Sequence, residues 1–203
     1  MANIFQSFLQ GGTHEYSEIR SSLEVDIAEE KSFIAILKEH HDYIEESIKV
    51  ILSKCAPDED KQIHANRFFK LVQMHGKAEQ ETLYENLMSS PSLDARLEGF
   101  SGQDEHEIAF QLEDELKEMG LGAQWNDEIA AKVKVAATLV QNHIKEEESE
   151  MFGIARETLS DETFAAMRTT YIAKCREFLD RIDIELMHNA TLSSPYDLPT
   201  ERI

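Results

Sequence analysis

Residues 34–51 read IAILKEHHDYIEESIKVI, and apolar side chains recur in this stretch every three or four positions. The stripe comprises Ile34, Leu37, His41, Ile44, Ile48 and Ile51. Residues at this spacing share one face of an α-helix, which predicts a helix that packs into a bundle. His41 lies inside that face, whereas the adjacent His40 would point ~100° away from it. The stretch therefore predicts a bundle helix that carries a histidine into the core.

Three further segments repeat this pattern, and each carries a histidine on its apolar face. The stripes are Phe68, Val72, His75, Glu79, Leu83 and Leu87; His106, Ala109, Leu112, Leu116 and Met119; and Ile129, Val133, Ala136, Val140, His143, Glu147, Met151 and Ile154. In two of the stripes a glutamate follows the histidine after four residues, on the same face of the helix. The chain thus has four helical segments whose apolar faces, which we expect to point into the bundle, each carry a histidine.

The composition and the breakers between these segments predict the fold class. Glycine and proline are sparse, at 8 and 4 of 203 residues, which favours helices over sheets. We expect helices over residues 26–54, 60–88, 102–119, 126–157 and 161–187, with the longest connection at 89–101. The predicted fold is all-α, an up-down four-helix bundle over residues 26–158. A short N-terminal extension (1–25) and an additional C-terminal helix with a tail (159–203) would flank it.

The charge and the cysteine content exclude several classes of partner. A formal net charge of −20 would repel nucleic-acid phosphates and an anionic membrane surface. No stretch approaches the ~20 apolar residues of a membrane span, and the N-terminal residues lack the pattern of a secretory signal. The two cysteines, Cys55 and Cys175, do not suggest a disulfide framework. We therefore expect a cytoplasmic protein with no nucleic-acid partner and no membrane partner.

The polar side chains on the inward faces predict a metal centre. A buried imidazole or carboxylate without a partner is costly, and one metal centre at the middle of the bundle would satisfy all of them. The candidate ligands are His41, His75, Glu79, His106, His143 and Glu147. Six side chains exceed the needs of one tetrahedral zinc, and calcium or magnesium prefers oxygen ligands. Imidazole with carboxylate suits iron or manganese, and two carboxylates suggest bridges between two ions.

Four segments carry a resemblance to a known family. They are LKEHHDYIEESIKVI (37–51), HGKAEQETLY (75–84), DEHEIAFQLEDEL (104–116) and NHIKEEESEMF (142–152). In this order they resemble the helix signatures of the hemerythrin-like (HHE) cation-binding domain, over about residues 33–156. The resemblance implies two iron ions joined by an oxo or hydroxo bridge. It assigns the same six side chains as their ligands.

The chain departs from oxygen-carrying hemerythrins in two places. Phe110 stands where those proteins have a fifth histidine, and Glu147 follows His143 after four residues where they have an aspartate after five. This four-His, two-Glu pattern resembles bacterial and regulatory members of the family. It implies a protein that binds or reacts with dioxygen, peroxide or nitric oxide. The alternatives are iron or oxygen sensing, storage or repair without turnover, or a structural metal site in an interaction protein, with an unidentified protein partner.

Several polar residues receive other roles. We expect Tyr84 at the bundle boundary and not as a redox relay. Glu113 lies seven residues after His106, on or near the inner face, and we expect it to be exposed to solvent and not to transfer protons at the site. His64 would lie at the surface or at an end of the bundle, about three turns before His75. His14 and His188 lie outside the bundle pattern and have no assigned role. The possible turnover of a small ligand, as by a peroxide- or oxygen-reactive oxidoreductase, is left open by the sequence.

Overall fold

The computed structural model describes residues 20–24 and 30–192, and the side chains of residues 20–24 and 30–182. Helices are its only regular elements over these residues, which confirms the all-α prediction. The elements are α2 (Phe33–Ile51), α3 (Asp58–Glu79), the π-helix η1 (Gln80–Tyr84), α4 (Glu85–Met88), α5 (Leu93–Glu118), α6 (Asp127–Glu146), the π-helix η2 (Glu147–Met151), α7 (Phe152–Thr158) and α8 (Asp161–Leu192). Residues 20–24 are also helical. Within the described residues, none of the helices has the length and apolar character needed to cross a bilayer.

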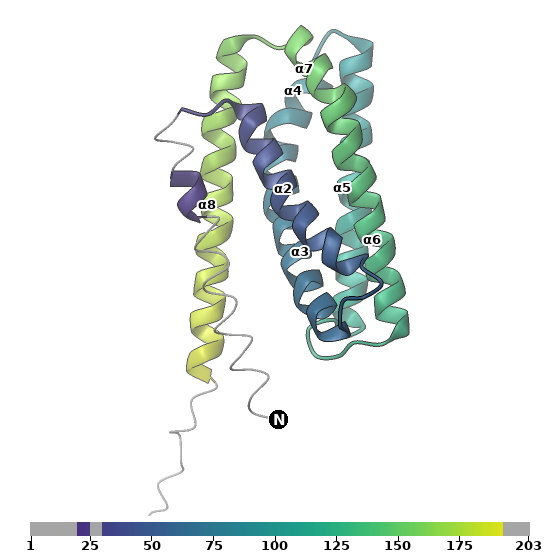
Figure 1. Cartoon of the computed structure of the whole chain (residues 1–203). Helices are drawn as coiled ribbons and strands as arrows, with labels where there is room; N and C mark the ends of the chain where they lie inside the picture. The colour runs from purple at the N-terminus through teal and green to yellow at the C-terminus, as the bar shows by residue number, and fades with distance from the viewer. Residues whose placement is uncertain (1–19, 25–29, 193–203) are drawn as a thin grey trace, which may run out of the picture. The chain divides into compact units, whose positions relative to one another are not determined.

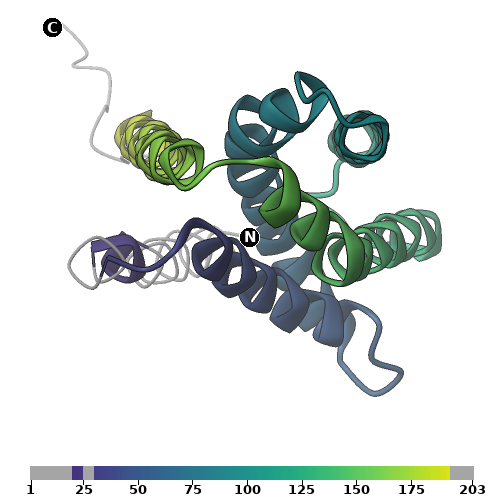
Figure 2. The same ribbon diagram turned by 90° about the horizontal axis from the view of Figure 1, so that it is seen from above.

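The chain divides into two compact units, residues 31–174 and residues 1–30 with 175–203. The larger unit contains the four-helix bundle. Helix α2 packs against α3 and α6, and α5 packs against α6 and α4. Figure 1 shows α2, α3, α5 and α6 side by side, and Figure 2 shows them from above around a common interior. This arrangement confirms the predicted bundle with an additional C-terminal helix.

Two of the four bundle segments are each built from an α-helix, a π-helix and a second α-helix. The first runs through α3, η1 and α4, and the second through α6, η2 and α7. A π-helix joins residues five apart by hydrogen bonds, so it changes which side chains share a face. In both segments the π-helix begins at or directly after a candidate ligand, Glu79 or Glu147. The local backbone is therefore irregular at the candidate site.

Three of the bundle helices have an N-terminal residue whose side chain caps the helix. Ser32 accepts a hydrogen bond from the Ala35 amide at 3.3 Å, Ser92 from Ala95 at 3.4 Å, and Asn126 from Ile129 at 3.0 Å. Such caps satisfy amides that have no partner inside the helix. Between α5 and α6 the chain turns at Gly120, whose φ of 86° is readily adopted by glycine. These local signals place the helices that carry the candidate ligands.

The third bundle helix begins earlier than the sequence predicts. It starts at Leu93 and not at Gly102, so the predicted long loop at 89–101 is wrong. Leu97 and Phe100 are 58% and 54% exposed, and they therefore form no inward stripe that would reveal the helix. Gly102 lies inside this helix, and a Cβ at that position would come within 2.7 Å of the Tyr84 ring. The glycine permits close packing between two helical segments and does not end one.

Candidate metal centre

The six predicted ligand side chains meet in the interior of the larger unit. Each is at most 4% exposed. Their potential ligand atoms form two groups, and within each group these atoms lie within 4.8 Å of one another. The first group, which we call site A, comprises His41, His75, Glu79 and Glu147; the second, site B, comprises Glu79, His106 and His143. The structure thus brings all six together, and their binding of metal stays a prediction.

The two glutamates lie between the four imidazoles. In site A, His41 Nε2 is 3.1 Å from Glu147 Oε2, and His75 Nε2 is 2.9 Å from Glu79 Oε2. On the other side, His143 Nε2 is 3.5 Å from the second oxygen of Glu147, Oε1. His106 Nε2 is 3.8 Å from Glu79 Oε2. Each carboxylate therefore faces one imidazole of site A and one imidazole of site B.

Buried polar atoms at the centre indicate that a cation fits. Among the described residues, Glu79 Oε1 has no hydrogen-bond partner although Glu79 is fully buried. His41 Nε2 lies 3.2 Å from His75 Nε2, so two nitrogen atoms that can each bind a metal ion face each other in site A. Unsatisfied carboxylate oxygen in an interior is costly, and a positive ion relieves that cost. The mixture of imidazole and carboxylate donors matches the preference of iron or manganese.

The pKa values of the glutamates are displaced in opposite directions. Burial raises the pKa of Glu79 well above its usual range, and the nearby Glu147 charge adds to this. For Glu147, burial acts in the same direction, but the positive charges of His143 and His41 outweigh it and lower the pKa. Two negative charges this close together repel, so Glu79 and Glu147 are not readily ionised at the same time. Burial therefore favours the protonated form of Glu79, whereas the adjacent imidazoles favour the charged form of Glu147.

The pKa values of the four candidate histidine ligands are also displaced in opposite directions. Burial alone would lower the pKa of His41, but hydrogen bonds to Glu147 and Glu148 raise it to about 10. The pKa of His143 is also raised, because the charge of Glu147 outweighs the effect of burial. Burial lowers the pKa values of His75 and His106. The raised pKa values of His41 and His143 mean that protons compete with a metal ion for these two side chains.

Three of the four imidazoles have an outer hydrogen-bond partner at Nδ1. His41 Nδ1 lies 3.0 Å from Glu148 Oε1, and His143 Nδ1 lies 2.7 Å from Glu105 Oε2. His75 Nδ1 lies 2.7 Å from the hydroxyl of Tyr171. A hydrogen bond donated from Nδ1 leaves Nε2 free to bind a metal and fixes the orientation of the ring. No pattern in the sequence marks Glu105, Glu148 or Tyr171 as partners of the ligands, because their positions next to the ligands follow from helix packing.

His40 belongs to neither site, as its predicted direction implies. Its Nδ1 lies 2.7 Å from the Tyr171 hydroxyl. Burial and the nearby His75 lower the pKa of His40 to about 3, so the ring is neutral. His64 is half-buried and also outside both sites. His14 and the side chain of His188 lie outside the described residues.

Two expectations about polar residues are wrong. Tyr84 is fully buried and not at the boundary, and its hydroxyl lies 2.6 Å from Glu147 Oε1 and 3.2 Å from His143 Nε2. Burial, with the charges of Glu147 and Glu79, raises the pKa of this hydroxyl. Glu113 is 2% exposed and not in solvent, and Lys117 donates to its Oε1 at 2.8 Å. Glu113 lies outside both sites.

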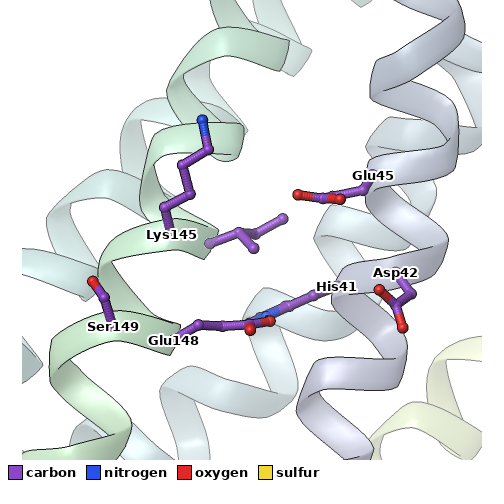
Figure 3. Close-up of a pocket in the computed structure, with 7 residues that line it drawn as sticks. His41, Asp42, Glu45, Lys145, Glu148 and Ser149 are labelled. Atoms are coloured by element: carbon purple, nitrogen blue, oxygen red, sulfur yellow. The ribbon is translucent and has the colours of Figure 1, made fainter.

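A cavity of about 470 Å³ adjoins site A. Its lining residues are His41, Asp42, Glu45, Ile144, Lys145, Glu148 and Ser149. Figure 3 shows the side chains of His41 and Glu148 approaching each other from two helices at this cavity. Lys38 also binds Glu148, with Nζ 2.8 Å from Oε2. His41 and its hydrogen-bond partner Glu148 both line the cavity, so a candidate ligand forms part of its wall.

Comparisons with known proteins agree with the geometry. The family model described as the hemerythrin HHE cation-binding domain matches residues 32–155, which contain all six candidate ligands. No curated protein matches the chain. No solved structure matches it either. With the family model covering more than half of the sequence, the chain belongs to the hemerythrin HHE cation-binding domain family.

Proposed function

We propose that this domain holds two iron ions and that the pair binds or reacts with a small ligand such as dioxygen, peroxide or nitric oxide. The observation that carries the proposal is the position of Glu79, which contributes to both groups of ligand atoms. Glu147 supports it, since its two oxygens face His41 and His143 on opposite sides. A carboxylate between two sets of imidazoles suits two neighbouring metal ions better than one.

The proposed ligands divide evenly between the ions. His41 and His75 would bind one ion and His106 and His143 the other. Glu79 belongs to both groups, and the two oxygens of Glu147 face His41 and His143, so both glutamates would lie between the ions. Bound iron would supply electrons and coordination positions for a small ligand. The side chains of this chain hold the imidazoles by their outer hydrogen bonds and exclude water, since every proposed ligand is at most 4% exposed.

The surroundings favour reaction over stable, reversible oxygen carriage. Phe110, which stands where oxygen carriers have a fifth histidine, places an apolar ring 6.0 Å from the His106 ring. It offers no nitrogen to complete the coordination at that side. On the site A side, Glu148 lies at the cavity in hydrogen-bond contact with His41. Its carboxylate can accept or return a proton through His41 Nδ1 and is 33% exposed.

Metal analysis and optical spectroscopy of the purified protein test the proposal. We expect about two irons per chain after reconstitution, and a near-ultraviolet charge-transfer band that changes on adding oxygen or peroxide to the reduced protein. One zinc per chain, with no uptake of iron, would contradict the iron pair. A stable oxygenated form that releases oxygen under vacuum over repeated cycles would contradict reactivity and leave a binding function. No spectral change with oxygen, peroxide or nitric oxide would indicate a structural metal site.

A further inference from the structure

Tyr84 and Phe152 occupy matching places in the two halves of the candidate centre. Each histidine–glutamate pair is followed by a π-helix, and each aromatic residue lies five positions after the glutamate. In a regular α-helix, a residue five positions on would point ~140° away from the glutamate. In a π-helix, hydrogen bonds join residues five apart, and these residues come onto one face. The π-helices thus turn both aromatic rings toward the centre.

The two aromatic residues differ in what they present to the metal sites. Phe152 stacks on His41 with ring centroids 5.9 Å apart and an interplanar angle of 10°. It adds no polar atom to site A, which already has four candidate ligands. Tyr84 lies against His106 with ring centroids 5.1 Å apart. Its hydroxyl is therefore the polar group that distinguishes site B from site A at this position.

The Tyr84 hydroxyl lies among the ligand atoms of site B. It is 3.3 Å from His106 Nε2, 3.2 Å from His143 Nε2 and 3.5 Å from Glu79 Oε2. These three atoms belong to the residues that make up site B. Gly102 leaves room for the ring, because a Cβ there would come within 2.7 Å of it. A metal ion bound by these three residues would have the phenol oxygen within reach as a further donor.

We propose that Tyr84 is itself a metal ligand, and that its phenolate oxygen completes site B. The inference rests on the proposed function, because it requires a metal ion between His106, His143 and Glu79. On binding, the O–H bond of Tyr84 breaks, an oxygen–metal bond forms, and the proton leaves to solvent. No electron is transferred in this step. Site B, whose group of ligand atoms comes from Glu79, His106 and His143, thereby gains a further protein ligand.

A phenolate bound to ferric iron has a visible charge-transfer band and tyrosinate ring vibrations in the resonance Raman spectrum. We expect both in the diferric wild-type protein, with ring vibrations that shift when the protein carries ring-deuterated tyrosine. Tyr84→Phe should lose the band and the vibrations. Tyr43→Phe is the matched control, because its hydroxyl donates to Glu39 at 3.2 Å, outside both sites. It should keep both signals.

The iron content of each sample is measured beside its spectrum, so that two failures can be told apart. Wild-type protein that binds two irons and shows no tyrosinate signal overturns the role of Tyr84 and leaves the proposed function standing. Wild-type protein that binds no iron overturns both. If Tyr84→Phe keeps the tyrosinate signal, another tyrosine is the ligand and the inference is wrong. If that variant fails to fold, each of the other four tyrosines is changed to Phe in turn. A tyrosinate signal that survives all four changes supports Tyr84 as the ligand, and loss of the signal in any one of them overturns the inference.

Discussion

The hydroxyl of Tyr171 lies 2.7 Å from Nδ1 of His75 and 2.7 Å from Nδ1 of His40. Tyr171 lies in α8, outside the four bundle segments, and it is fully buried. When the Nδ1–H group of His75 donates a hydrogen bond to the Tyr171 oxygen, the Tyr171 hydroxyl can donate its own hydrogen bond to Nδ1 of the neutral His40. A helix outside the bundle thereby orients a candidate metal ligand.

Tyr171→Phe should weaken metal binding without removing a ligand. Loss of an outer hydrogen bond to a metal-binding histidine commonly lowers affinity about tenfold or more. We expect that loss for a divalent ion measured by competition with a chelator, while iron in excess still fills the centre. The tyrosinate signal assigned to Tyr84 should persist in the filled protein. An unchanged metal affinity would show that Tyr171 does not position His75.

Glu79 should matter for both ions, whereas His143 should matter mainly for one. Glu79→Ala removes a side chain common to site A and site B, so we expect nearly complete loss of bound iron. His143→Ala removes a ligand of site B alone and should retain iron at site A. Iron per chain, measured on variants whose circular dichroism matches the wild type, checks this. His64→Ala is the control and should keep the wild-type content; equal losses in both ligand variants would contradict two sites joined by Glu79.

The adjacent histidines of α2 should behave differently. His41→Ala should lose iron, because His41 Nε2 faces His75 and Glu147. His40→Ala should keep iron but unfold at a lower temperature, since it removes a buried hydrogen-bond partner of Tyr171 at a cost of roughly 1–3 kcal/mol. Iron content and thermal unfolding of the apo-protein separate the two effects. Loss of iron in His40→Ala but not in His41→Ala would mean that His40, and not His41, is the ligand from α2.

The sequence predicts the parts of the site that follow regular helix geometry. His75 and Glu79, or His143 and Glu147, share a face because they are four residues apart, and the apolar stripe selects His41 over His40. Tyr84 was missed because its approach depends on a π-helix, which the hydrophobic period does not reveal. Glu148 is next to Glu147 in sequence and points elsewhere in a regular helix, so its contact with His41 depends on how α2 and η2 pack. The start of α5 was missed because its first apolar residues face solvent.

Metal binding should release protons. At pH 7 His41 is protonated in the metal-free protein, because its pKa is about 10, and the raised pKa values of His143 and Glu79 act in the same direction. A metal ion requires neutral imidazole and ionised carboxylate, so protons compete with it and the affinity falls as the pH falls. Each released proton changes the affinity about tenfold per pH unit.

A weakly buffered solution with an indicator dye measures this release when a divalent ion is added. We expect at least one proton per chain, with His41→Gln releasing fewer than the wild type when both are saturated. Binding with no proton release at pH 7 would contradict the protonated state of His41. Zinc serves as the probe here, because it has no redox chemistry that would add or remove protons.

Glu113 gives a pH effect that is independent of the metal centre. Burial raises the pKa of its carboxyl above the ordinary 4.5, although the hydrogen bond from Lys117 partly opposes this. A raised pKa means that the folded state binds the proton more tightly than the unfolded chain. The wild-type protein therefore loses stability as the pH rises from the ordinary value through the raised one.

Glu113→Gln keeps an oxygen that can accept from Lys117 and removes the charge that burial disfavours. We expect the free energy of unfolding of the variant, minus that of the wild type, to increase between pH 4 and pH 7. Urea unfolding of the two apo-proteins at several pH values measures this difference. Glu107→Gln is the control, because that side chain is exposed, and its difference from the wild type should not follow the same trend. A difference for Glu113→Gln that decreases with pH would mean that the ion pair with Lys117 outweighs burial, and that Glu113 stabilises the fold as a charged group.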